Sequence, residues 1–141
     1  MAETDAIFGG EHSGHFYFRD FWRADSGMLA ALHVLAALGE SGQERPLSRL
    51  LGQFRRYADS GEVNSEVADV GAATEAVRKA FASREGVQMD ELDGLTVDLA
   101  DGSWFNLRPS NTEPLLRLNV EAADGSAVAA LRDEVLSIIR A

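Results

Sequence analysis

The chain has 141 residues, of which 45% are hydrophobic, and its 13 basic and 23 acidic side chains give a net charge of −10. This length allows one domain, or one domain and part of another, and the acidic balance disfavours nucleic acid and anionic membrane surfaces as partners. The lack of cysteine excludes disulfides and thiolate metal sites. No signal peptide opens the sequence and no run approaches the roughly 18 apolar residues of a membrane span, so we expect a cytoplasmic protein.

The first predicted element is a hairpin, because the aromatic segments 6–8 and 16–18 are typical of short strands. The glycine-punctuated loop between them carries Glu11, Ser13 and His15. Glu11 and Ser13 alternate, so in an extended loop both can face one ligand, and a carboxylate beside a hydroxyl suits vicinal sugar hydroxyls. His15 titrates near neutral pH and can move protons.

The same loop allows two other interpretations. His12-x-x-His15 beside Glu11 could form a metal site, although no third ligand of a known zinc pattern follows. The segment could also be a polar hairpin with two solvated histidines.

A helix is predicted over 28–38, after Asp25-Ser26 and before Gly39, because it has a capping residue, good helix formers and a terminal glycine. It is apolar on most sides, so we expect it to be buried. We interpret His33 on this helix as a structural histidine. Hairpin and helix together are too small to form a core of their own.

Beyond the polar segment 40–45, which we interpret as a linker, helices and strands alternate. The predicted helices cover 47–54, 70–83 and the segment capped by Asp124, and the predicted strands cover 57–67, 95–99, 104–107 and 115–121. The apolar stripe of the last helix needs the apolar face of the sheet for its burial. We therefore predict an α+β fold in which three helices cover an antiparallel sheet of about four strands.

The last two predicted strands are joined by Arg108-Pro109-Ser110-Asn111-Thr112-Glu113-Pro114, the densest run of hydrogen-bonding side chains in the sequence. Each proline holds the residue before it in an extended conformation. Between the prolines, hydroxyls, an amide and free backbone N–H groups can converge on one point. Arg108 adds a planar cationic fork that suits carboxylate or phosphate. The run therefore predicts an anion-binding loop.

Two plainer structures compete with that interpretation. Ser110-x-x-Glu113 is also a capping box that would open a helix, although Pro114 would then stand at the fourth helical position and remove a needed donor. The other alternative is an ordinary polar turn between two strands.

Together, Gly10-Glu11-His12-Ser13-Gly14-His15 and the run from Arg108 to Pro114 resemble the two substrate loops of the α-D-phosphohexomutase family, in particular its bacterial phosphomannomutase/phosphoglucomutase branch. The resemblance implies that Glu11 and Ser13 hold sugar hydroxyls and that His15 is a catalytic acid or base. It implies that the non-reacting phosphate is bound by Arg108, Ser110, Asn111 and Thr112. Arg117 is a candidate electrostatic helper that the motif does not assign.

The resemblance further implies an enzyme that interconverts hexose 6-phosphate and hexose 1-phosphate through a phosphoserine and a bisphosphorylated sugar. The family's phosphoserine loop and Mg²⁺ loop are absent from these 141 residues. Residues 1–40 then correspond to the end of the third, sugar-binding α/β domain, a hairpin-plus-helix remnant. Residues 41–141 correspond to the C-terminal phosphate-binding domain, with a TATA-binding-protein-like fold. The partners are sugar phosphates and the missing N-terminal domains; Mg²⁺ is expected outside this chain, which alone should be inactive.

Two alternatives to this function stay open. The chain could be a stand-alone phosphosugar- or anion-binding module without catalysis. It could also be a fragment of a phosphoglucosamine mutase, although those enzymes typically carry Gln and Gly at the positions that His12 and Asn111 occupy here.

Overall fold

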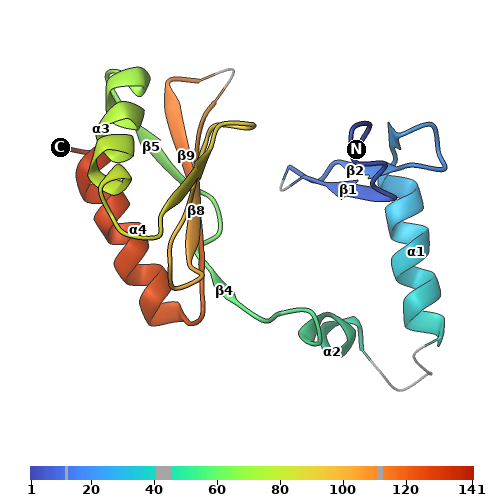
Figure 1. The fold of residues 1–141 in the computed structure, drawn as a ribbon. Coiled ribbons are helices and arrows are strands. Elements are labelled where there is room, and N and C mark those ends of the chain that lie inside the picture. Colours follow the sequence, from blue (N-terminus) through green and yellow to red (C-terminus); the bar gives the residue numbers. More distant parts are fainter. Residues whose placement is uncertain (12, 41–45, 111–112) are drawn as a thin grey trace. The chain divides into compact units, whose positions relative to one another are not determined.

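The computed structural model describes residues 1–11, 13–40, 46–110 and 113–141. The chain divides into two compact units, Met1–Phe54 and Arg55–Ala141. Figure 1 shows a small sheet and a long helix in the first unit, and a larger sheet with two helices in the second. The short helix α2 (Leu47–Gly52) belongs to the first unit. The structure thus assigns the predicted helix 47–54 to the first unit and not to the unit that contains the larger sheet.

The first unit is built on a three-stranded antiparallel sheet in the order β1-β2-β3. Strands β1 (Phe8–Gly10) and β2 (Phe16–Phe18) form the predicted hairpin. Strand β3 (Ala24–Asp25) pairs with the other edge of β2 and was not predicted, because two residues carry no alternation. Helix α1 (Gly27–Glu40) is preceded by Ser26, whose hydroxyl caps it by accepting a hydrogen bond from the Leu29 N–H at 3.2 Å.

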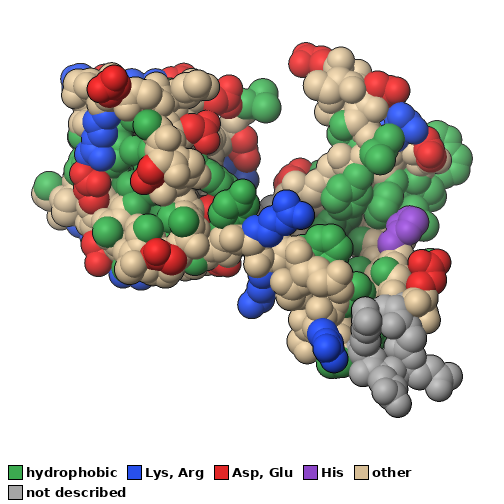
Figure 2. Space-filling model, turned by 60° about the horizontal axis from the view of Figure 1, so that its bottom comes forward, with side chains coloured by type: hydrophobic (Ala, Val, Ile, Leu, Met, Phe, Trp, Pro, Cys, Tyr) green, Lys and Arg blue, Asp and Glu red, His purple; other side chains and the backbone are tan. Residues whose placement is uncertain are grey.

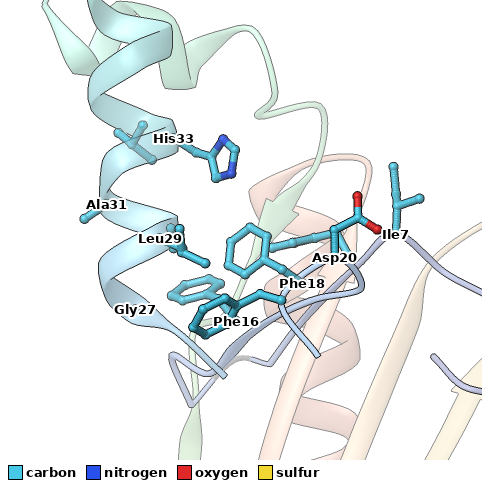
Figure 3. Close-up of a pocket in the computed structure, with 12 residues that line it drawn as sticks. Ile7, Phe16, Phe18, Asp20, Gly27, Leu29, Ala31 and His33 are labelled. Atoms are coloured by element: carbon cyan, nitrogen blue, oxygen red, sulfur yellow. The ribbon is translucent and has the colours of Figure 1, made fainter. Parts of the chain in front are cut away.

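Helix α1 and the small sheet leave apolar surface uncovered. Within α1, which the structure describes throughout, no residue is buried. Phe16, Phe18 and Leu29 line a largely apolar hollow between β2 and α1, with the His33 ring stacked on Phe18 at 5.4 Å (Figure 3). In Figure 2, apolar side chains gather on the exposed surface of this unit. The described residues between 1 and 54 do not provide the burial that the composition of this helix predicts.

The second unit contains a six-stranded antiparallel sheet in the order β4-β9-β8-β7-β6, with β5 also paired to β9. Its strands are β4 (Ala58–Asp59), β5 (Val63–Glu66), β6 (Gln88–Asp90), β7 (Leu95–Asp98), β8 (Trp104–Pro109) and β9 (Leu115–Ala122). Helices α3 (Val70–Ala82) and α4 (Gly125–Ile139) lie on one face of this sheet (Figure 1). This arrangement confirms the predicted α+β class.

The core lies between the sheet and these two helices. Alternate residues of the strands point inward, including Phe105 and Leu107 of β8, and the helices contribute Val77, Phe81 and Val135. Phe81 and Phe105 meet edge to face at 4.9 Å. Both helices begin at the predicted aspartate caps: Asp69 accepts from the Ala72 N–H, and Asp124 accepts from the N–H groups of Ser126 and Ala127.

The sheet has more strands than the sequence predicts. The predicted strand 57–67 is broken into β4 and β5 by a turn at Ser60–Glu62, where Gly61 adopts a φ of +60°. The Ser60 hydroxyl accepts a hydrogen bond from the Val120 N–H at 2.9 Å, which ties this turn to β9. Strand β6 was not predicted from the sequence, because its three residues carry a single apolar side chain, Met89. Among the described helices, none is long and apolar enough to cross a bilayer.

Candidate functional site

The first candidate loop connects β1 to β2. The Glu11 N–H donates to the His15 carbonyl at 2.9 Å, and the Gly14 N–H donates to the Glu11 carbonyl at 3.0 Å. Gly14 has a φ of +85°, which glycine adopts without the steric cost of a side chain. These bonds close a tight loop with Glu11 and His15 at its base. His12, the other half of the alternative metal site, lies outside the described residues.

The Glu11 carboxylate is held from two sides. The Ser13 hydroxyl donates to Oε2 at 3.0 Å, and the Tyr17 hydroxyl donates to Oε1 at 2.8 Å. By accepting this bond, the carboxylate raises the pKa of Tyr17 above its ordinary value. The structure thus places Glu11 beside Ser13 and adds Tyr17, which sequence reasoning treated as part of a strand. In the sequence, a role for Tyr17 is indicated only by the two-residue alternation of a strand, which places its side chain on the face opposite Phe16 and Phe18.

His15 is bound by a second carboxylate. Its Nδ1 lies 2.6 Å from Oδ2 of Asp25, and the other oxygen of Asp25 accepts the Phe16 N–H at 2.8 Å. The hydrogen bond to Asp25 and the charge of Asp25 raise the pKa of His15. The hydrogen bonds from His15 and from the Phe16 N–H lower the pKa of Asp25. Sequence reasoning missed this role, because Asp25 had been assigned to the helix cap.

The second candidate loop connects β8 to β9, and strand β9 begins at Leu115, so the alternative in which the capping box opens a helix is wrong. The Ser110 N–H donates to the Leu115 carbonyl at 2.8 Å. The expectation that this N–H is available to an anion is therefore wrong, because it closes the hairpin instead. Asn111 and Thr112 lie outside the described residues.

Arg108 and Arg117 face each other across this hairpin. They are Cα partners on β8 and β9, and their neighbours Leu107 and Leu116 are buried under the helices, so both arginines project from the opposite face of the sheet. Arg108 Nη1 lies 3.1 Å from Asp93 Oδ2, and Arg117 Nη2 donates to the Ser110 hydroxyl at 3.4 Å. Both side chains remain partly exposed, at 26% and 29%.

Acidic groups offset this pair of cations. Asp93 is 73% exposed, and Glu62 Oε1 lies 3.8 Å from Arg117 Nε, too far for a hydrogen bond. Within the described part of the chain, no acceptor is hydrogen-bonded to this Nε. The hairpin thus presents two guanidinium groups next to the Ser110 hydroxyl. Their carboxylate neighbours, Asp93 and Glu62, are themselves partly exposed to solvent. Such a set can bind an anion in bidentate fashion.

The position of Arg108 depends on a glycine in the preceding turn. Gly94 has a φ of +76°, and a Cβ on it would lie 2.7 Å from the Leu107 carbonyl oxygen and 3.0 Å from Arg108 Cα. The adjacent Asp93 carbonyl accepts a hydrogen bond from the Asn106 side chain at 2.8 Å. The turn that carries Asp93 is thereby packed against the backbone of β8 at Arg108.

Comparison with known proteins matches both units to one family. Residues 1–57 match the α/β/α domain III of phosphoglucomutase/phosphomannomutase. Residues 62–138 match the C-terminal domain of the same enzymes. The chain belongs to the phosphoglucomutase/phosphomannomutase family.

Several relatives share this similarity over almost the whole chain. A phosphomannomutase of Methanocaldococcus jannaschii is 40% identical over 139 residues, which are 99% of this chain and 30% of that protein. A phosphomannomutase of Salmonella montevideo is 43% identical over 142 residues, with the same coverage. A crystal structure of a family protein from Burkholderia thailandensis matches 99% of this chain and 29% of its own, with a TM-score of 0.71 and 28% identity. This phosphohexomutase-family chain thus spans about 30% of the length of these relatives.

The described residues do not fit a resident metal ion. Across 1–11, 13–40, 46–110 and 113–141, no three His, Asp or Glu side chains lie close enough together to hold one. The carboxylates near the candidate sites are instead engaged by Tyr17, His15 and Arg108.

Proposed function

We propose that this chain is the C-terminal part of a phosphohexomutase that interconverts hexose 6-phosphate and hexose 1-phosphate through a phosphoserine and a bisphosphorylated sugar. Family membership and relatives named phosphomannomutase support the reaction class. The observation that carries the binding role is the pair Arg108 and Arg117 beside the Ser110 hydroxyl. In a chain of net charge −10, two such cations on one sheet face are a local site for a phosphate dianion.

In this proposal the loop of the first unit binds the sugar. Glu11 accepts hydrogen bonds from two hydroxyl donors, so its oxygens are spaced to accept from vicinal sugar hydroxyls that replace them. Ser13 can turn its hydroxyl from Glu11 to the sugar. His15 lies at the base of the same loop and would exchange a proton with the reacting oxygen.

The second unit would bind the phosphate that does not react. Arg108 would turn its guanidinium from Asp93 to the phosphate. Asp93 competes only weakly with the ligand, because it is largely exposed and solvent screens its charge. Ser110, Asn111 and Thr112 would supply hydroxyl and amide donors. A dianion offers more acceptor oxygens than one carboxylate, so the exchange favours the ligand.

The remaining parts of the reaction would come from outside these residues. We infer that N-terminal domains of the same protein supply the phosphoserine and bind Mg²⁺, which neutralises charge on the transferred phosphoryl group. The exposed apolar face of α1 supports this, because residues such as Leu32 and Leu35 are 55% and 61% exposed and need a covering partner. We expect the rest of domain III to cover this face.

The phosphate assignment is tested by following backbone amide shifts while mannose 1-phosphate is added to the 141-residue chain. We expect weak, salt-sensitive binding, with shifts at 108–117, and no binding of free mannose. Each charge-assisted hydrogen bond is worth roughly 1.5–3 kcal/mol, so Arg108→Ala should remove most of the affinity. Arg108→Lys should restore it in part, because a point charge lacks the fork. If these amides stay still at millimolar ligand while distant ones move, the assignment is wrong.

A further inference from the structure

The Asp25 carboxylate is fixed more firmly than an ordinary surface acid. It ends β3, where its Cα is paired with Tyr17 of β2, and its Oδ1 accepts the Phe16 N–H at 2.8 Å. The next residue, Ser26, donates its N–H to the Phe16 carbonyl at 2.9 Å and starts α1. Strand pairing, a side-chain bond to the backbone and a helix start therefore set the position of this carboxylate before it meets His15.

Stability alone gives little reason for this arrangement. The side chains of His15 and Asp25 are 53% and 38% exposed, and exposed ion pairs contribute little to folding because solvent screens them. What the geometry does achieve is orientation. Because Asp25 binds Nδ1 at 2.6 Å, the neutral ring carries its proton on Nδ1 and leaves Nε2 as the atom that can take up or release a second proton.

We propose that Asp25 is a positioning residue for His15, which fixes the ring by Nδ1 and presents Nε2 to the substrate. This rests on the proposed function of His15 as an acid or base. When Nε2 takes a proton from a sugar hydroxyl, the Asp25 carboxylate stabilises the resulting imidazolium without itself accepting the proton. In the reverse direction the imidazolium returns the proton from Nε2 to the sugar oxygen.

The other groups around His15 act in the same sense. The Glu11 carboxylate adds a second negative charge that favours the protonated ring. Tyr17 packs beside the imidazole, with ring centroids 6.5 Å apart, and its hydroxyl is occupied by Glu11. Among the described residues, Asp25, Glu11 and Tyr17 are therefore the titratable groups beside the ring, and the two carboxylates both stabilise its charged form.

The first test is ¹⁵N spectroscopy of the histidine rings in the 141-residue chain. We expect the neutral His15 ring of the wild type to be predominantly Nδ1–H. Asp25→Asn should lower the pKa of His15, whereas Asp20→Asn, which removes an exposed carboxylate bound to Arg19, should leave it unchanged. A wild-type ring protonated mainly on Nε2, or an unchanged pKa in Asp25→Asn, would overturn the proposal. The wild-type measurement decides the question even if Asp25→Asn fails to fold.

The second test separates positioning from a purely structural role, and uses the full-length parent enzyme. For Asp25→Asn we expect kcat to fall roughly 10-fold or more with KM within about threefold, and the ionisation in the pH profile of kcat to move to lower pH. Asp20→Asn should match the wild type. An unaltered kcat and pH profile in Asp25→Asn would leave Asp25 a structural residue and refute the proposal. A wild-type kcat in His15→Gln would instead refute the proposed function of His15 itself.

Discussion

Arg108 and Arg117 stand directly opposite each other on adjacent antiparallel strands, with both guanidinium groups on the face of the sheet that the helices leave open. Like charges in this cross-strand position repel each other and destabilise a sheet. Asp93 and Glu62 offset the repulsion in part, at 3.1 and 3.8 Å. An anion between the arginines would offset it more fully, so binding and folding should be coupled at this pair.

Replacing Arg117 tests that coupling. We expect Arg117→Met to weaken binding of inorganic phosphate or mannose 1-phosphate about 10-fold or more, because it removes a charge-assisted hydrogen bond worth roughly 1.5–3 kcal/mol. Without ligand its stability should change by less than about 1 kcal/mol, since a repulsive pair is lost with the contacts. Arg132→Met is the control, because Arg132 pairs with its exposed neighbour Asp133 on α4. Equal affinity of the two variants in calorimetric titration would contradict this.

Gly94 offers a second test, through the backbone. A Cβ at this position would clash with the Leu107 carbonyl in addition to the strain of its φ of +76°. Gly102→Ala has similar strain, with a φ of +84°, but nothing within 4 Å. We expect Gly102→Ala to cost about 1 kcal/mol and Gly94→Ala more than about 2 kcal/mol in urea unfolding. Gly94→Ala should also weaken phosphate binding, because it shifts the backbone at Arg108. An equal loss of unfolding free energy in both variants would contradict this expectation, because it would mean that β8 accommodates the added Cβ.

The sequence predicts those parts of the structure that depend on local patterns. The aromatic strands beside the glycine loop, the aspartate caps and the apolar stripe of the last helix all lie where their periodicity and capping residues indicate. Short strands such as β3 and β6 escape prediction, because they exist only through pairing with β2 and β7. The turn at Gly61 within the predicted strand 57–67 likewise depends on the tertiary contact of Ser60 with β9.

The same distinction holds for the candidate site. Glu11, Ser13, His15 and Arg108 could be proposed from residue type and spacing. Their partners Asp25 and Asp93 could not, because folding brings them from 10 and 15 residues away. The engagement of the Ser110 N–H also depends on the register of β8 and β9, which the sequence leaves open.

We expect the His15–Asp25 pair to give the first unit a small dependence of stability on pH, because both side chains are partly exposed. The folded pKa of His15 lies above 6.5, so its contribution to stability is complete below pH 6.5 and is lost as the pH rises through the folded pKa. The folded pKa of Asp25 lies below 3.8, so its contribution is present above pH 3.8 and is lost as the pH falls through the folded value. We expect maximal protection of the Phe16 amide between these limits. Protection in Asp25→Asn should vary less with pH; an equal dependence in both proteins would contradict the linkage.

The two units should differ in stability. Helix α4 buries Val128, Leu131, Val135 and Ile139, whereas α1 buries none of its residues. Native-state hydrogen exchange should therefore show faster exchange over 6–38 than over α4, and a fragment of residues 55–141 should fold alone. Uniform protection from Ala6 to Leu38, equal to that of α4, would be incompatible with this expectation.

The chain by itself should not turn over hexose 1-phosphates. Phosphoryl transfer needs a phosphorylatable nucleophile and a metal to neutralise charge, and the family's loops for both are absent from these 141 residues. A coupled assay with purified chain and glucose 1,6-bisphosphate should give the background rate. Turnover that co-purifies with the chain and disappears in His15→Gln would contradict the proposed division of roles.

Strand β9 pairs with β8 on one edge and with both β4 and β5 on the other. During synthesis, β4 and β5 therefore emerge long before the strand that joins them to the sheet, which begins at Leu115. A nascent chain that has not reached this residue holds β4 and β5 without β9, and α3 without its neighbour α4. The second unit can thus be completed only after β9 has been synthesised, and a chain that stalls before Leu115 would leave strand edges and apolar surface open to aggregation.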